Sequence, residues 1–496
     1  MEHQNPTLKT GEDSGSGVNS KCDTIENVQP ALCEKKILQL SLNPSLESIV
    51  ISSKEKDLLA SRESDHDPRN WPAKKKNLIL FIIAAAGILA PISSTIFFPA
   101  LIEVRNDLNT TEVLANGLVA VFILFTGIAP LGWASYSDAY ATRRKVYLVS
   151  IMLFQITSVI CGIANNIWVL MLMRALQACG ASAVQSIGAG SISDIFHPHG
   201  EFPSISTTTS PLIGPIIGGY LTQYLGWRWI FWFLTIFGGI LILIIFFALP
   251  ETFRKTSPSH SLPQTSPTAP RGRFNPLAPL ALLRYPNVSL TLLYVSSVFA
   301  IIYVQNTLIS KNFTQLYNLR TSDVGLVFLG PSSGYIVGSV IGGKYSDFVF
   351  NKSAKKCDGG VGYPEMRLNS TWFAMISLPA SYVTYGWMIA HRLGMMFPLI
   401  AMFIGGFSCL IVFNSTSTYL VDAFPGRSAS AIAVNNFLRS IAAATVSAAA
   451  APLQDALGIG WLYTIMSGLT LIGSGFLVLV YFKGKNWREK LENEGT

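Results

Sequence analysis

Long runs of apolar residues, separated by short polar segments, dominate the chain from residue 78 onward. A helix needs about 20 apolar residues to cross the hydrocarbon core of a bilayer. Nine uncharged runs have about this length: 78–101, 113–137, 146–164, 229–250, 285–310, 324–343, 368–390, 393–421 and 456–482. Two further runs, 167–190 and 428–453, are each interrupted by a single arginine. These runs predict transmembrane helices.

A weaker twelfth candidate lies between residues 202 and 227. It carries no charge before Arg228, but its first half is polar, and only the 15 residues 211–225 are firmly apolar. At 1.5 Å per residue these cover about 22 Å, which is short of the roughly 30 Å core. Serine and threonine side chains can face a cavity, so the segment can still span; a miscalled splice junction or a decayed copy is the alternative. With this segment, the pattern predicts an all-α membrane protein with twelve transmembrane helices.

Basic residues gather on one side of the predicted spans. With twelve crossings, 21 lysines and arginines fall on the side of the N-terminal tail and 5 on the other side. Loops rich in lysine and arginine stay in the cytosol. The asymmetry therefore places both termini in the cytosol, and it supports twelve spans because losing one would mix the two sets. The net charge of +8 then belongs to cytosolic loops and indicates no nucleic-acid partner.

Composition excludes several other classes of protein. Hydrophobic residues make up 50% of the chain and charged residues 13%, against roughly 25% charged in soluble domains. The six cysteines form no CxxC pair and no Cys/His spacing typical of a metal site. The sequence also lacks a GxxxxGK[ST] loop for ATP and the hydrolase patterns HExxH and GxSxG. We expect neither an enzyme nor a protein that holds a metal or an organic cofactor.

Polar segments divide the chain into tails, a linker and two lobes. Residues 1–76 predict a disordered cytoplasmic tail, and 255–284, rich in Ser, Pro and Thr, predict a flexible cytoplasmic linker. We predict six-helix lobes at 77–254 and 285–482, followed by a cytoplasmic tail at 483–496.

The two lobes share a short sequence repeat. Tyr136-Ser137-Asp138 recurs as Tyr345-Ser346-Asp347, a shift of 209 residues, and each copy ends the second span of its half before a basic loop. Two six-span repeats joined by a cytosolic linker are typical of secondary transporters, whose substrate site lies between the repeats near the middle of the membrane.

Several motifs, in this order, resemble those of the major facilitator superfamily. Residues 132–138 followed by Arg143-Arg144-Lys145 are similar to the family's loop motif between spans 2 and 3, and 342–347 to its echo between spans 8 and 9. Residues 174–180 resemble the span-4 motif and 214–219 the span-5 antiporter motif. The run 141–148 is similar to the fungal quinidine-resistance and dityrosine-transporter branch.

This resemblance covers about residues 70–490 and implies a drug:proton antiporter. The substrates that it implies are organic cations, drug-like amphiphiles, polyamines or a dityrosine-like metabolite, and a proton gradient takes the place of a cofactor. It also implies a monomer in the lipid bilayer of the plasma membrane. Ala139 and Ala141 depart from the Arg and Gly of the loop motif, and 200–210 is shortened and polar where the family has Glu-Arg-Gly and an apolar start. The second departure motivates an alternative, a transport-impaired copy or a non-transporting membrane interaction protein.

Arg174 stands alone in an apolar span, where an unpaired cation is costly and should face protein or a water-filled cavity. The resemblance implies a role in proton coupling, in which the arginine biases a nearby acceptor or water between protonation states. The alternative is an arginine that extends toward the near end of its helix, since Asn165 and Asn166 lie one or two turns away. Gln177 lies three residues on and should share the face of Arg174.

Two further motifs have a conformational interpretation. Asp138 and Asp347, with Arg143, Arg144 and Lys145, would latch the two lobes together on the cytosolic side; the alternative is ordinary interfacial charge. In the antiporter motif, small residues at helical spacing would seal the lobe interface, or simply pack helices as in many membrane proteins. The residues of that motif are Gly214, Pro215, Gly218 and Gly219.

The substrate cavity is poorly specified by the sequence. No acidic residue lies in the first span, which carries Ser93-Ser94-Thr95 instead. Arg439 is a second intramembrane cation, and it could pair with Asp422 or with substrate. The other candidates are polar or aromatic residues within spans: Gln185, Tyr303, Gln305, Asn306, Tyr335, Asn414, Asn435 and Asn436. Each of these alone is better explained as a satisfied polar group in the core than as a substrate ligand.

Overall fold

The computed structural model describes residues 71–140, 142–195, 210–252, 278–355, 363–424 and 428–494. The chain divides into two units, 1–70 and 71–496, and all of the described residues belong to the second. Every regular element in the described residues is a helix. The polar segment 200–209 and residues 1–70 of the predicted tail lie outside the described residues.

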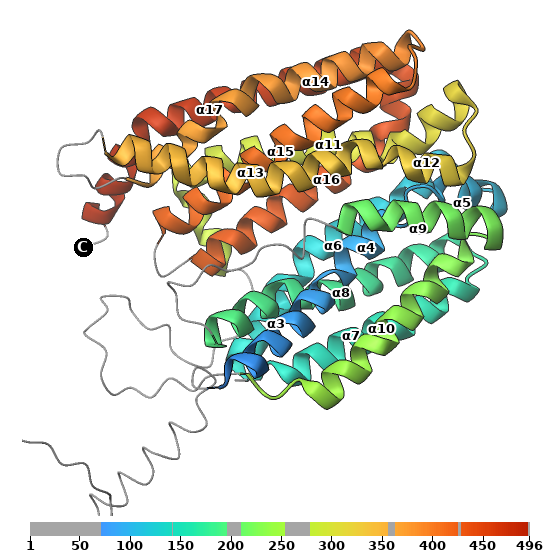
Figure 1. The fold of residues 1–496 in the computed structure, drawn as a ribbon, viewed down its shortest axis with the longest axis horizontal. Helices are drawn as coiled ribbons and strands as arrows, with labels where there is room; N and C mark the ends of the chain where they lie inside the picture. The colour runs from blue at the N-terminus through green and yellow to red at the C-terminus, as the bar shows by residue number, and fades with distance from the viewer. Residues whose placement is uncertain are drawn as a thin grey trace, which may run out of the picture. The chain divides into compact units, whose positions relative to one another are not determined.

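The first group of helices covers the described residues from Ala73 to Ala248. It consists of α3 (Ala73–Gly87), α4 (Leu89–Thr95), α5 (Leu101–Asp107), α6 (Glu112–Ala139), α7 (Arg144–Ile163), α8 (Ile167–Ile195), α9 (Ser210–Leu225) and α10 (Arg228–Ala248). The helices α3, α4 and α5 follow one another along one apolar span of 35 residues, Ala73–Asp107. Figure 1 shows this group as the blue-to-green bundle.

The second group covers the described residues from Ala278 to Glu494. It consists of the 3-10 helices η3 (Ala278–Arg284) and η4 (Pro364–Thr371) and the α-helices α11 (Pro286–Tyr317), α12 (Thr321–Val327), α13 (Leu329–Ala354), α14 (Trp372–Ala390), α15 (Met396–Ala423), α16 (Ser428–Leu457) and α17 (Ile459–Glu494). The pair α12 and α13 forms one span of 34 residues. Helix α17 continues to Glu494, through the segment for which the sequence predicts a tail.

These helices provide twelve crossings, because α3–α5 and α12–α13 each count as one. In the described residues, nine spans are long and apolar enough to cross a membrane by length and composition. The other three are α9, α14 and α16. Helix α9 has only 16 residues, whereas α16 has 30 but contains two asparagines and an arginine. Both contact several other helices, which replace lipid around part of their surface.

Local sequence explains where several helices begin and end. The hydroxyl of Thr111 accepts a hydrogen bond from the backbone N–H of Leu114 at 3.3 Å, which caps the start of α6. Helices α9 and α16 end before Gly226 and Gly458, whose φ angles are 93° and 81°. Glycine takes this left-handed conformation without a Cβ clash. The two glycines occupy equivalent turns, after the fifth span of each group.

The repeated tripeptide also occupies equivalent places in the two groups. Ser137 and Ser346 are both buried, whereas Tyr136 and Tyr345 are both exposed. Each copy lies near the end of a long helix, α6 or α13. The burial pattern thus follows the sequence repeat.

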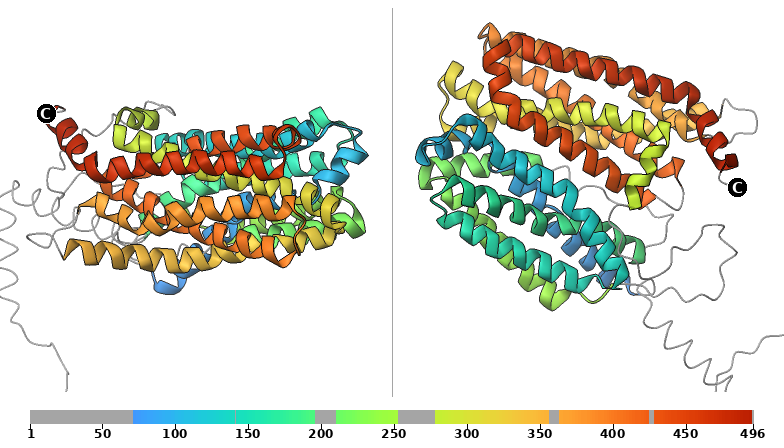
Figure 2. Two further views of the ribbon diagram at one scale, coloured as in Figure 1. Left: turned by 90° about the horizontal axis from the view of Figure 1, so that it is seen from above. Right: turned by 180° about the vertical axis from the view of Figure 1, so that it is seen from behind.

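The two groups meet mainly at one end of their helices. We call the end with Trp71 and the last turns of α17 the terminal end, and the opposite end the distal end. Helices α9 and α12 contact each other at the distal end, as do α5 and α11, while α6 and α16 pack together. Among the described helices, α3, α7, α8 and α10 make no comparable contact with the second group. Figures 1 and 2 show the two groups diverging toward the terminal end.

Candidate functional site

Arg174 lies fully buried inside the first group of helices. Its exposed fraction is 0%, and Nη1 donates to the backbone oxygen of Ser93 at 3.2 Å and to Oε1 of Gln177 at 2.9 Å. Nε2 of Gln177 in turn donates to Oγ of Ser158 at 2.7 Å. Arg174 and Gln177 share one face of α8, as their spacing predicts, and they connect this helix to α4 and α7.

Aromatic rings enclose the same guanidinium group. Its carbon lies 4.3 Å from the ring centroid of Phe122 and 4.8 Å from that of Phe97. Such contacts stabilise a desolvated cation by about 2 kcal/mol. Nε and Nη2 of Arg174 have no hydrogen-bond partner in the described residues. The side chain does not extend to the end of its helix, and it keeps two donors available for a water molecule or an acceptor.

Glycines of the antiporter motif set the position of α9. A Cβ at Gly214 would lie 2.2 Å from Oγ1 of Thr95, and one at Gly218 would lie 1.9 Å from the backbone oxygen of Ile96. These two positions seat α9 against the first span of the same group. A Cβ at Gly219 would lie 2.8 Å from the backbone oxygen of Thr321, at the start of α12.

The contact with α12 joins the two groups of helices. A Cβ at Gly325 would lie 2.7 Å from the backbone oxygen of Pro215, so glycines approach from both sides of the interface. The side chain of Gln223 accepts a hydrogen bond from the backbone N–H of Ser322 at 2.8 Å. The motif therefore has two packing roles, one within the first group and one across the interface at the distal end.

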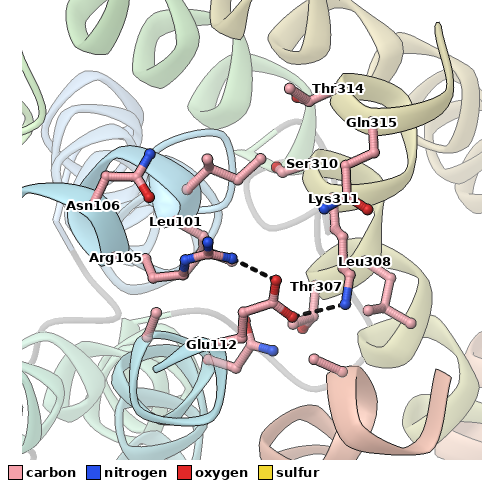
Figure 3. Close-up of a pocket in the computed structure, with 14 residues that line it drawn as sticks. Leu101, Arg105, Asn106, Glu112, Thr307, Leu308, Ser310, Lys311, Thr314 and Gln315 are labelled. Atoms are coloured by element: carbon pink, nitrogen blue, oxygen red, sulfur yellow. Dashed lines mark hydrogen bonds and ion pairs between the residues drawn. The ribbon is translucent and has the colours of Figure 1, made fainter. Parts of the chain in front are cut away.

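A cluster of charges also bridges the groups at the distal end. Glu112, at the start of α6, accepts from Nη1 of Arg105 at 2.6 Å and from Nζ of Lys311 at 2.7 Å. Nζ of Lys311, on α11, also lies 2.8 Å from Asp455. Figure 3 shows Arg105 and Lys311 approaching the carboxylate of Glu112 from helices on its two sides. A pocket of about 620 Å³, part of it open to solvent, surrounds this cluster.

At the terminal end, Glu251 ties two helices of the first group together. Its carboxylate accepts from the backbone N–H groups of Arg143 and Arg144 at 2.8 and 3.3 Å and from the hydroxyl of Thr142 at 3.2 Å. These donors lie at the start of α7, where a carboxylate is favoured. Lys145 is exposed. The side chain of Asp138 lies outside the described residues.

Replacement of Glu251 should weaken this junction measurably. Loss of a capping side chain costs about 1 kcal/mol, so we expect Glu251→Ala to lower the midpoint of thermal unfolding of the purified protein. The unfolding midpoint of Glu251→Gln, which keeps one acceptor oxygen, should lie between those of Glu251→Ala and the parent. Equal midpoints for Glu251→Ala and the parent would show that the cap contributes nothing.

Asp347 lies in an ion-pair network within the second group. Arg367, on η4, donates from Nη1 to Asp347 at 2.9 Å and from Nε to Asp422. Burial lowers the pKa of the Arg367 guanidinium, but hydrogen bonds and charge from the two carboxylates outweigh it, so that the pKa is raised. In this conformation Asp347 pairs within its own group. The alternative in which Arg439 pairs with Asp422 is not observed, because Arg367 holds that carboxylate.

Arg439 lies in the interior of the second group. The guanidinium carbon is 4.5 Å from the ring centroid of Phe299, on α11, and 5.0 Å from that of Phe413, on α15. The residue is partly exposed. The charge of Arg439 interacts with the hydroxyl of Tyr303 and the thiol of Cys409.

The remaining candidate cavity residues divide by their hydrogen bonds. Nδ2 of Asn414 donates to the backbone oxygen of Ser339 at 3.3 Å, whereas both amide atoms of Gln305 are buried without a partner in the described residues. The hydroxyl of Tyr335 lies beside the side chain of Asn306, and neither this hydroxyl nor Oδ1 of Asn306 has another partner there. These three carry unused polar groups within the second group. The others are distributed over two helices and partly or fully buried: Gln185 on α8, and Asn435 and Asn436 on α16.

Sequence patterns did not reveal the partners of Glu112, Lys311, Glu251 and Arg367. Glu112 and Lys311 are 199 positions apart, and each stands at a helix position where a charge is ordinary. The only local signal was their location at the ends of spans. Pairing across such separations depends on how the two groups are placed.

Comparison with known proteins decides the family. Residues 83–446 match the Major Facilitator Superfamily, which is more than half of the chain. The chain belongs to the Major Facilitator Superfamily. Members of this superfamily are transporters rather than enzymes, and the all-α fold with twelve spans in two repeats agrees with this membership. The protein is therefore an integral, multi-pass membrane transporter that acts on small molecules.

Fungal transporters are among its similar relatives. Citrate exporter 1 of Aspergillus niger is 30% identical over 485 residues, which cover 89% of this chain and 92% of that protein. The MFS antiporter QDR3 of Candida albicans is 28% identical over 553 residues, which cover 84% of this chain and 79% of that protein. The efflux pump radE of Floropilus chiversii is 29% identical over 445 residues, which cover 85% of this chain and 82% of that protein.

A solved structure of a transporter homolog shares the fold. A bacterial homolog of the human lysosomal transporter Spinster, in an inward-facing and unoccupied conformation, superposes with a TM-score of 0.59 at 14% identity, covering 85% of this chain and 99% of that one.

Proposed function

We propose that this protein is a secondary active transporter that exports a small organic molecule in exchange for protons. Its two helix groups would rock about a site between them and open it alternately to either side of the membrane. The observation that carries this proposal is the closed distal interface formed by the glycine contacts of α9 and α12 and by the Glu112–Lys311 ion pair.

The positive-inside rule supports an orientation for this state. Basic loops place the terminal end in the cytosol, so the distal end would face the outside, in our proposal across the plasma membrane. The groups are joined at the distal end and diverge toward the terminal end. This arrangement fits a state that admits substrate from the cytosol, which is the loading state of an exporter. The protein would work as a monomer.

Arg174 supports coupling to protons. It is a fixed cation in a dry environment, with Gln177 and Ser158 beside it and two of its own nitrogens, Nε and Nη2, without a hydrogen-bond partner among the described residues. In low dielectric, such a charge strongly disfavours a second proton on a neighbouring group or water. Movement of α4 relative to α8 would change the hydrogen bond from Arg174 to Ser93, and this gives a physical link between helix position and proton affinity.

Transport by the purified protein in proteoliposomes tests the proposal. We would load vesicles with a pH-sensitive dye and offer citrate, rhodamine 6G and spermidine in turn, with and without a protonophore. A transported substrate should evoke a proton flux of opposite direction, and its accumulation should collapse with the gradient. Accumulation that is equal with and without the gradient would contradict proton coupling.

Substitution of Arg174 should separate coupling from exchange. We expect Arg174→Gln to lose gradient-driven accumulation at least tenfold, because each lost hydrogen bond to a charged group is worth about 1.5–3 kcal/mol, while substrate exchange without a gradient continues. Arg174→Lys keeps the charge but not the planar contact with Phe97 and Phe122. Its gradient-driven accumulation should lie between that of the parent and that of Arg174→Gln. Unchanged accumulation by Arg174→Gln would remove this residue from the mechanism.

A further inference from the structure

Arg439 is a cation placed near the middle of the membrane. It lies eleven residues after the start of α16 at Ser428, which is about 16 Å along the helix. Phe299 and Phe413, the rings beside it, are likewise in the central turns of α11 and α15. Rings from two different helices hold the guanidinium group, so it points between helices of the second group and not into lipid.

No carboxylate neutralises this cation in the described part of the chain. Arg439 makes no ion pair or hydrogen bond with another described residue. The carboxylates with described side chains lie near helix ends or in connections, and the two nearest by sequence, Asp455 and Asp422, are held by Lys311 and Arg367. Aromatic faces satisfy only part of a buried cation, because they accept no hydrogen bonds in the plane of the guanidinium. The five N–H donors of this arginine are therefore available to a ligand.

The two intramembrane arginines differ in a way that separates their roles. Arg174 is fully buried and bonded to Ser93 and Gln177, so it belongs to the internal framework of the first group. Arg439 is partly exposed and carries no such bonds. Of the two, only Arg439 combines partial exposure with the absence of a hydrogen bond to another described residue.

Neutral donors lie on the helices around Arg439. Tyr303 and Cys409 are electrostatic neighbours of both Arg439 and Tyr335, which places these four residues in one region of the second group. The hydroxyl of Tyr335 lies beside the side chain of Asn306, and neither this hydroxyl nor Oδ1 of Asn306 has another hydrogen-bond partner among the described residues. Hydroxyl groups can donate to the second oxygen of a carboxylate, whereas a cationic ligand would find no negative charge here.

We propose that Arg439 anchors the carboxylate of an organic anion, whose apolar or planar part lies against Phe299 and Phe413. Arginine suits this task because its planar fork can bind both carboxylate oxygens at once. This inference rests on the proposed transport function and narrows its substrate to organic carboxylates, in preference to the organic cations and polyamines that the sequence motifs imply.

Binding to the purified full-length protein tests this assignment without any gradient. We would measure ligand-dependent thermal stabilisation with citrate, 4-phenylbutyrate, spermidine and rhodamine 6G. The parent should be stabilised by one or both carboxylates and not by the two cations. Arg439→Gln should weaken carboxylate binding at least tenfold, and Arg439→Lys should weaken it less. The matched control is Arg320→Gln, which removes an equal charge from an exposed position and should bind as the parent does.

Several results would overturn the assignment. These are stabilisation of the parent by the cations alone, stabilisation by none of the four probes, or equal carboxylate affinity in Arg439→Gln and the parent. If Arg439→Gln does not fold, Arg439→Lys is compared with the parent instead. Equal carboxylate affinity in these two proteins would contradict the assignment. Carboxylate binding that depends on Arg439, together with transport that ignores the proton gradient, would sustain this inference while contradicting proton antiport.

Discussion

Gly218→Val should unfold or severely destabilise the first group of helices. Even the first atom of a side chain at this position, Cβ, would lie 1.9 Å from the backbone oxygen of Ile96 and 2.9 Å from its carbonyl carbon. Backbone atoms cannot rotate away as a flexible side chain can, so α9 must move from the first span. Overpacking of this kind costs about 1–3 kcal/mol, and occasionally more.

A matched substitution isolates the effect of the contact. Gly468, on α17, has nothing within 4 Å of its Cβ position, so Gly468→Val introduces the same side chain without the clash. We expect a lower yield of folded protein and a lower unfolding midpoint for Gly218→Val, and little change for Gly468→Val, both measured by size-exclusion fluorescence after heating. Equal midpoints for the two variants would show that α9 is not seated as described.

Lys311→Gln should open the distal end of the protein. The pair of Lys311 with Glu112 joins the two groups, and the side chain of Lys311 is only 14% exposed. A partly buried ion pair of this kind is worth about 1–2 kcal/mol, which corresponds to a roughly 5- to 30-fold shift in a two-state population. The distally open state should therefore become much more populated.

Labelling from outside the membrane measures this shift. Thr314 lines the distal pocket, and Thr314→Cys should react with a membrane-impermeant maleimide faster when Lys311→Gln is present. Arg105→Gln is the control, because Arg105 pairs with Glu112 inside the same group and does not join the two. A labelling rate independent of Lys311 would mean that this ion pair does not hold the groups together.

Much of the fold is predictable because its signals are local. Apolar runs mark the spans, and three-residue spacing on one helix predicts that Arg174 and Gln177 share a face, as observed. The repeat of Tyr136-Ser137-Asp138 predicts equivalent environments, and Ser137 and Ser346 are indeed both buried.

The candidate site is less predictable because it depends on contacts between distant segments. Nothing near Asp422 in the sequence indicates that Arg367, 55 residues earlier, holds it. Local patterns likewise cannot show that Gly218 faces the first span while its neighbour Gly219 faces α12. The substrate classes suggested by motifs concern a family as a whole, whereas the unpaired charge of Arg439 is a property of this chain's own packing.

The measurement that tests alternating access most directly is the distance between the two groups at the terminal end. Spin labels at Lys145 and Lys344, exposed residues beside the repeated tripeptides, would report it by double electron–electron resonance in lipid nanodiscs. We predict two distance populations, a long one that matches the conformation described here and a shorter one whose share changes with pH and with a transported carboxylate. A single distance that responds to neither would contradict a transporter that works by rocking two helix groups.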